Sequence, residues 1–204
     1  MALYELKRAN TVNIVTLLTT VTEGYNRISM HGVRRLLLLE QVEALGYPLE
    51  EITIPQNCSN DIYENRMQAV LEKYQQQGVS AVAFGDLFLE DIRSFREKNM
   101  NRIGMQSIFP LWKKNTVELA QEFIQLGFRA FITCVDTQVL PREFSGREYD
   151  EDFLKDLPDG IDPCGENGEF HSFVYNGPIF SRPVAVKRGE KVLRDERFFY
   201  CDLL

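Results

Sequence analysis

Several kinds of segment that would assign a protein to a class at once are missing from this sequence. No apolar stretch among the 204 residues approaches the roughly 20 that a helix needs to cross a bilayer. Basic residues are scattered, and 23 Lys and Arg against 30 Asp and Glu leave a net charge of −7. Because nucleic acids and anionic membranes attract basic clusters, we expect neither as a partner.

The four cysteines likewise lack a paired spacing. Cys58, Cys134, Cys164 and Cys201 form no CxxC motif, and no secretory signal is recognised ahead of them. We therefore expect reduced thiols in a cytoplasmic protein. With 44% hydrophobic residues, the chain can bury the core of one domain and a small appendage.

What is present is a regular alternation of helical and extended patterns. Apolar residues at helical spacing predict helices over residues 1–10, 32–46, 61–78, 89–99 and 115–127. Continuous apolar runs predict buried strands at 11–21, 49–55, 79–86, 105–112 and 128–136. Strands that are apolar on both faces and separated by helices are typical of a doubly wound, mostly parallel α/β sheet, which we predict for residues 1–136.

The remaining residues, 137–204, have a different character. The first part is polar, acidic and rich in glycine, with a short helix expected at 150–157. Extended patterns at 173–180 and within 183–204 predict antiparallel strands, the last two joined by a turn at Arg188-Gly189-Glu190. We predict a small α+β appendage here.

Candidate ligand-binding residues follow the predicted strands, because open α/β sheets bind ligands at the carboxyl ends of their strands. Thr19, Gly85, Asp86 and Asp136 occupy such positions. An Asp there can orient Mg²⁺ or a ribose hydroxyl, and it can equally cap the helix that follows. His31 precedes a predicted helix whose amino-terminal end could share an anion with it, although a solvated loop histidine fits the pattern as well.

The densest group of reactive side chains lies in residues 162–172. Two glycines flank Glu166-Asn167, and two carboxylates, an amide and an imidazole fall within six residues. Such a loop could bind a polar substrate and transfer protons, and a polar surface turn remains the alternative interpretation. Cys164 and His171 alone do not supply the ligands of a zinc site, so we predict no resident metal.

Stretches spread over nearly the whole chain resemble one known family, the diphthine–ammonia ligases. These are residues 29–33, 39–46, 84–86, 109–112, 135–136, 146–148 and, above all, Gly-Glu-Asn-Gly-Glu-Phe-His at 165–171. The family belongs to the PP-loop (N-type) ATP pyrophosphatases, which have a HUP-like, adenine nucleotide alpha-hydrolase-like fold. The resemblance implies a cytoplasmic enzyme that uses ATP and Mg²⁺ to adenylate a carboxylate, which ammonia then converts to an amide.

The resemblance also implies roles for particular residues. The nucleotide would lie across Thr19, His31, Gly85, Asp86 and Asp136. The catalytic residues would be Glu166 and Glu169, and the acceptor or its ammonia would be held by Gly165, Asn167, Gly168, His171 and Arg147. The acceptor itself stays open, and so does the choice between a monomer and a homodimer.

One departure from the family pattern concerns the start of the given sequence. Family members begin with an apolar strand and a Ser-Gly-Gly-Lys-Asp-Ser loop that binds pyrophosphate, whereas Met1 here falls where the following helix is already under way. We expect a truncated record, in which the strands at 11–21 and 79–86 face a gap. The hypotheses are therefore a ligase whose phosphate loop is absent from this sequence and, alternatively, a non-catalytic binding protein derived from that family.

Overall fold

The computed structural model of the chain describes residues 1–24, 26–28 and 31–204. Its elements in chain order are α1 (Ala2–Ala9), β1 (Leu17–Thr22), β2 (Arg27–Ile28), α2 (Arg35–Leu45), β3 (Leu49–Ile54), α3 (Asn60–Gln76), β4 (Ala81–Ala83), α4 (Glu90–Arg102), β5 (Gln106–Ile108), α5 (Thr116–Gln125), β6 (Arg129–Asp136), the 3₁₀ helix η1 (Arg142–Phe144), α6 (Glu151–Asp156), β7 (Phe170–Asn176), β8 (Arg188–Arg194) and β9 (Phe198–Leu203). Ser29 and Met30, part of one stretch that carries the family resemblance, lie outside the described residues.

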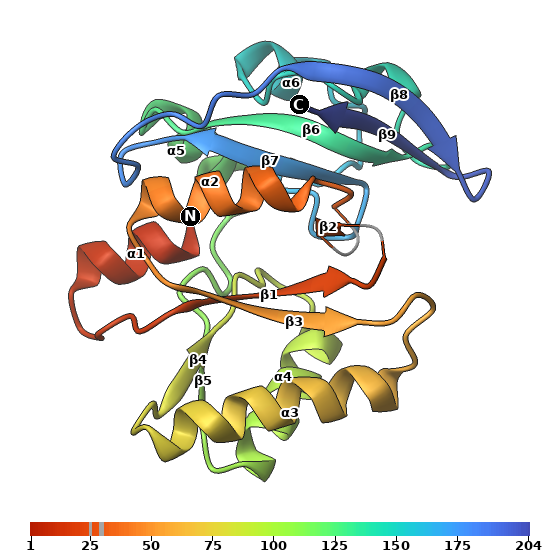
Figure 1. Cartoon of the computed structure of the whole chain (residues 1–204). Helices are drawn as coiled ribbons and strands as arrows, with labels where there is room; N and C mark the ends of the chain where they lie inside the picture. The colour runs from red at the N-terminus through yellow and green to blue at the C-terminus, as the bar shows by residue number, and fades with distance from the viewer. Residues whose placement is uncertain (25, 29–30) are drawn as a thin grey trace.

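These elements form a layered, mixed α/β structure (Figure 1). The sheet β6–β9 lies at the top of the view, with α5 and α6 on its outer side and α2 beneath it. Below α2 come β1 and β3, and below them α3 and α4 with β4 and β5. None of the described helices is both long and apolar enough to span a lipid bilayer.

Helix ends follow signals that the sequence carries. The Asn115 side chain caps α5 by accepting hydrogen bonds from the backbone N–H groups of Val117 and Glu118. Gly46 ends α2 with φ of +74°, a left-handed conformation that favours glycine. The predicted helices are thereby confirmed, with their ends shifted by a few residues.

The amino-terminal strands form two small sheets instead of one continuous parallel sheet. In the first, with order β2-β1-β3, β1 runs parallel to β3 from Leu17↔Leu49 to Thr22↔Ile54. In the second, β4 runs parallel to β5 over three residue pairs. The strand predicted at 11–21 is too long. The observed strand starts at Leu17, whose N–H donates to the carbonyl of Pro48 just before β3 begins. Among the described residues, no strand pairs with residues 11–16, where polar residues interrupt the apolar run.

The carboxyl-terminal sheet is antiparallel, in the order β7-β6-β9-β8. This corrects the expectation that β6 continues a parallel series, because both of its neighbours run opposite to it. Since those neighbours come from the chain beyond Asp136, the predicted units 1–136 and 137–204 share this sheet. The turn predicted at 188–190 is also wrong: these residues begin β8, and the β8–β9 turn lies at Asp195 and Glu196, with φ of +51° and +52°.

Apolar side chains cover both faces of the antiparallel sheet at β6, β7 and β9, whereas the edge strand β8 is largely exposed. On one face, Leu37 and Ala44 of α2 pack against Phe173, Tyr175 and Leu203 of the sheet. The other face packs against α5, η1 and α6 in a cluster whose buried members include Ala120, Ile132, Phe144, Phe153 and Phe170. The well-packed strands of this sheet therefore hold the ends of the loops that connect them.

A smaller apolar cluster connects α3 and α4 with β1 and β4. Leu71 and Met100 are its buried helical members. Trp112, the single tryptophan of the chain, follows β5 and lies beneath α4, where the guanidinium carbon of Arg93 is 4.6 Å from its ring centroid.

Candidate functional site

A groove of about 1070 Å³ lies between the two small amino-terminal sheets. Its walls come from α1, the segment leading into β1, α3, α4 and both β1 and β4. Thr19 and His31 line it, as do Phe84 and Arg96 from the β4–α4 region. Two of the predicted nucleotide-binding residues therefore share one groove of a size that suits a ligand.

The two strands that border this groove have unpaired edges. On the side of β1 away from β3, the described strand residues pair only at Val21 and Thr22, with β2, which leaves Leu17–Thr20 without a partner strand. β4 pairs with β5 on one side only. Free backbone N–H and C=O groups therefore face the groove from both sheets.

His31 meets His171 beside this groove. Their ring centroids are 4.7 Å apart and the rings are tilted by 53°. Burial lowers the pKa of His171 to about 4, and the neighbouring His31 acts in the same direction. Burial also lowers the pKa of His31, opposed by a hydrogen bond to the backbone of Ser172. At neutral pH the two imidazoles are uncharged, and they can accept or donate a hydrogen bond without carrying a charge.

The Gly165–His171 loop is organised around Glu169, a buried carboxylate. One oxygen accepts hydrogen bonds from the Asp162 N–H at 3.0 Å and from the Asn167 side-chain amide at 2.9 Å. The other accepts from the Asn167 backbone N–H at 3.0 Å. Gly165 has φ of +70°, and a β-carbon there would lie 2.9 Å from the Phe170 carbonyl oxygen, so the turn requires glycine.

Glu166 connects this loop to the segment that follows β4. One of its carboxylate oxygens accepts a hydrogen bond from the backbone N–H of Leu87 at 2.7 Å. Burial raises the pKa of Glu166, although hydrogen bonds from the backbone N–H groups of Leu87 and Phe88 oppose the shift. Both ends of this contact border a cavity of about 200 Å³, which Gly85, Cys164 and Ser172 also line.

Comparisons with known proteins match the part of the chain that contains the Gly165–His171 loop. Residues 115–202 match the family model described as the diphthamide synthase C-terminal domain. The chain is 27% identical to human diphthine–ammonia ligase over 187 residues, which are 87% of this chain and 68% of that protein. The corresponding mouse protein is 28% identical over 187 residues, with the same two shares, and the cattle protein is 28% identical over 180 residues, 84% of this chain and 66% of that protein.

The chain is similar to the diphthine–ammonia ligases, and its carboxyl-terminal part matches the diphthamide synthase C-terminal domain. The matched region contains the Gly165–His171 loop and most of the antiparallel sheet, and the chain spans about two thirds of the length of the relatives compared.

Three residues that the family resemblance suggested as ligand contacts form ion pairs in the structure. Asp86 pairs with Arg96 at 2.8 Å, at the border of the groove. Asp136 pairs with Arg197, and hydrogen bonding from this guanidinium lowers the pKa of Asp136.

Arg147 pairs with Asp156 at 2.9 Å and lies 5.0 Å from the ring centroid of Phe144. Neither Asp136 nor Arg147 lines either of the two hollows described above. Their suggested roles stay predictions, and the structure already gives each of them a partner within the fold.

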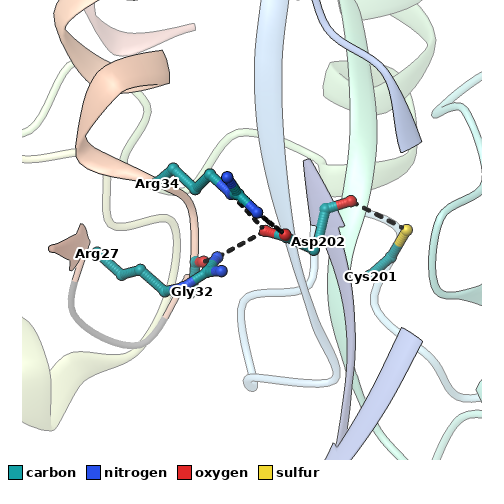
Figure 2. Close-up of polar contacts among 5 residues, drawn as sticks. All are labelled: Arg27, Gly32, Arg34, Cys201 and Asp202. Atoms are coloured by element: carbon teal, nitrogen blue, oxygen red, sulfur yellow. Dashed lines mark hydrogen bonds and ion pairs between the residues drawn. The ribbon is translucent and has the colours of Figure 1, made fainter. Parts of the chain in front are cut away.

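The charged cluster formed by Arg27, Arg34 and Asp202 was not predicted from the sequence. Asp202 of β9 accepts hydrogen bonds from Arg27 at 2.7 Å and from Arg34 at 2.5 Å (Figure 2). The partners are 175 and 168 residues apart, so a local motif could not reveal them. The one hint in the sequence was that Arg27 and Arg34 lie on either side of His31.

Proposed function

We propose that the protein is an ATP-dependent, amide-forming ligase that acts on diphthine or on a related carboxylate. The carboxylate oxygen attacks the α-phosphorus of ATP, pyrophosphate leaves, and an acyl adenylate forms. Ammonia then attacks the acyl carbon, AMP leaves with the bonding electrons, and the proton lost by nitrogen passes to a base. Adenylation is needed because a carboxylate has no good leaving group.

One observation carries this proposal: the Glu166–Leu87 hydrogen bond of 2.7 Å joins the family's Gly165–His171 loop to the segment after β4. The loop proposed to bind the acceptor, residues 165–171, thereby contacts the segment after β4, which is proposed to bind the nucleotide. A reaction between an acceptor and the α-phosphate of ATP requires both at one place.

The residues have distinct proposed roles. The nucleotide lies in the groove beside Thr19 and His31, near Gly85 and Asp86, and Glu166 is the base at the acceptor side. Glu169 acts by shaping the loop, since its carboxylate already accepts three hydrogen bonds from Asp162 and Asn167.

Mg²⁺ enters this proposal with the phosphates of ATP. Within the described residues, no group of three or more His, Cys, Asp or Glu side chains could hold a metal ion by itself. Mg²⁺ commonly needs only one or two protein carboxylates when phosphates supply other ligands, and Asp86, which pairs with Arg96 at the border of the groove, would contribute one of them.

We further propose that the complete fold is a doubly wound, HUP-like sheet in which one additional strand lies between β1 and β4. The free edges of β1 and β4 and the groove between them support this arrangement. The reading frame upstream of the Met1 codon tests it. We expect an apolar strand followed by a Ser-Gly-Gly-Lys-Asp-Ser loop, and a stop codon directly upstream would contradict this.

The activity is tested with ATP, Mg²⁺, ¹⁵N-ammonium and a diphthine-carrying protein. We expect AMP to be released and the carboxylate to become a ¹⁵N-amide, as measured by mass spectrometry. Glu166→Gln removes the proposed base and should lower amide formation at least tenfold with little change in the ATP dissociation constant.

Arg182→Ala is the matched control, because Arg182 is exposed and pairs only with Glu40 and Glu43 on α2 among the ion pairs described. It should leave the reaction unchanged. Equal losses of ATP binding and amide formation in Glu166→Gln would contradict an acceptor-side role.

The alternative function is a non-catalytic binding protein of the same family. The observation that favours it is that Asp86 and Asp136 are both engaged by arginines. In this case calorimetry would detect no binding of ATP, and no AMP would form with any acceptor.

A further inference from the structure

Arg27, Arg34 and Asp202 form a charged cluster next to His31 and Gly32. Figure 2 shows the two guanidinium groups converging on the Asp202 carboxylate from the same side of β9. Arg34 forms a two-pronged contact, with its Nε 3.2 Å from both carboxylate oxygens and its Nη2 2.5 Å from one of them. The Asp202 side chain is only 17% exposed, whereas that of Arg34 is 44% exposed, so the carboxylate is the more buried partner of this charge-assisted contact.

The two arginines lie on the two arms of a short hairpin. Arg27 and Arg34 face each other as an antiparallel bridge, and the N–H of Ile28 donates to the carbonyl of Val33 at 2.8 Å. His31 and Gly32 lie in the connection between the arms. Arg27 reaches back into it by donating to the Gly32 carbonyl at 2.6 Å.

A second contact fixes the same hairpin to the same strand. Gly32 has φ of +67°, and a β-carbon there would lie 2.8 Å from the ring of Tyr200 on β9. The backbone at Gly32 therefore packs directly on this ring. Two points of β9, at Tyr200 and Asp202, thus hold the hairpin, and the imidazole of His31 is left facing that of His171 on β7.

We propose that Asp202 is a positioning residue, which binds Arg27 and Arg34 and thereby keeps the imidazole of His31 against His171 at the groove. The functional consequence rests on the proposed function, in which His31 contacts the nucleotide. The geometric consequence does not, because it concerns only where the two rings lie.

The Asp202 carboxylate stays charged at low pH, which keeps its contacts with both arginines intact. Burial of Asp202 acts to raise its pKa, but hydrogen bonds from Arg34 and Arg27 outweigh burial and lower the pKa to about 2. The carboxylate therefore stays ionised, and both arms of the hairpin stay bound, at every pH at which the histidines titrate.

The two histidines are the only ones in the sequence, so they provide a direct readout by NMR. Their titratable neighbours do not interfere. Burial raises the pKa of Cys134, opposite His171 on β6, to about 11, and raises that of Tyr200 to about 12. Both groups stay protonated over the range of the titration.

The experiment is an imidazole NMR titration of the wild type and of Asp202→Asn, in which a neutral amide with a single acceptor oxygen replaces the carboxylate whose two oxygens accept from the guanidinium groups. In the wild type we expect His171 to titrate near pH 4. In the variant, loss of the hairpin contact exposes this ring to water and removes His31, so the pKa should rise by at least one unit toward 6.5 and the ring-to-ring NOE should disappear. Unchanged pKa values and an unchanged NOE would overturn the proposal.

Two further variants keep the test decisive. Arg34→Gln retains the Arg27 contact, so it should raise the His171 pKa by less than Asp202→Asn does. If Asp202→Asn does not fold, a folded Arg34→Gln protein with the wild-type histidine titration would still overturn the proposal. Glu43→Gln removes a carboxylate that binds Arg182 on the exposed side of α2 and should change neither histidine.

ATP binding by the Asp202→Asn protein separates this proposal from the proposed function. We expect the dissociation constant for ATP to rise several-fold together with the change in the histidine titration. A changed titration with unchanged ATP affinity would support the positioning role and contradict the nucleotide contact of His31.

Discussion

The antiparallel sheet and the paired parallel strands of this chain differ sharply in how completely they are packed. Six of the eight residues of β6 are buried, and apolar side chains cover both faces of the sheet around it, although the edge strand β8 is exposed. In contrast, α3 and α4 each bury a single residue, Leu71 and Met100, and β1 and β4 present free edges to a groove. The packed part holds loops in place, and the less packed part provides the space for a ligand.

Truncating one large side chain in each part should give the largest difference in the free energy of unfolding. Phe153→Ala removes a fully buried ring that packs against Tyr149 and Phe170, with centroids 5.1 and 5.3 Å away, and should lower the free energy of unfolding by about 3–5 kcal/mol. Met100→Ala should cost about 2 kcal/mol, because it widens an existing groove instead of opening a new cavity. Urea denaturation followed by far-UV circular dichroism measures both, and equal losses would break the comparison.

A smaller effect should come from the histidine contact between the two parts. The unfolded chain protonates His171 near pH 6.5 and the folded chain near pH 4, so the unfolded state binds more protons in this window. The free energy of unfolding should therefore fall as the pH drops from about 6.5 to about 4, by up to about 3 kcal/mol. Urea denaturation at pH 7, 5.5 and 4.5 measures this.

His171→Phe is the control for the pH effect. It removes the group whose pKa is lowered, so the fall in stability over this pH range should become shallower. An identical pH dependence in the variant would assign the effect to other groups.

The smallest effect concerns the turn between β8 and β9, where even the well-packed part retains strain. Glu196 has φ of +52°, which costs a non-glycine residue about 1–2 kcal/mol. Glu196→Gly should raise the free energy of unfolding by about 0.5–1 kcal/mol, after allowance for the greater entropy of glycine in the unfolded chain. The same substitution at Glu190, inside β8, should lower it by about 0.5–1 kcal/mol, and a gain at both positions would contradict this explanation.

Local signals in the sequence predicted the local structure well. Asn115 and Gly46 mark helix ends because a cap requires only neighbouring residues, and the apolar 128–136 run predicted β6. The partners of β6 could not be predicted in this way, because buried antiparallel and parallel strands have the same apolar composition.

The candidate site shows the same division. The glycines of the 165–171 loop mark a tight turn, and Gly165 does adopt a positive φ. That Glu169 would accept hydrogen bonds inside this loop, and that Asp202 would bind Arg27 and Arg34, depends on which distant residues the fold brings together. Sequence spacing carries no information on such contacts.

The location of Trp112 gives the less packed part an optical signal of its own. The indole lies after β5 and beneath Arg93 of α4, and the antiparallel sheet contains no tryptophan. Its fluorescence therefore reports the unfolding of the α4–β5 region alone, whereas circular dichroism averages over the whole chain. If the two parts unfold in separate steps, the fluorescence transition will precede the dichroism transition, and the chain will carry an intrinsic reporter for the region that surrounds its groove.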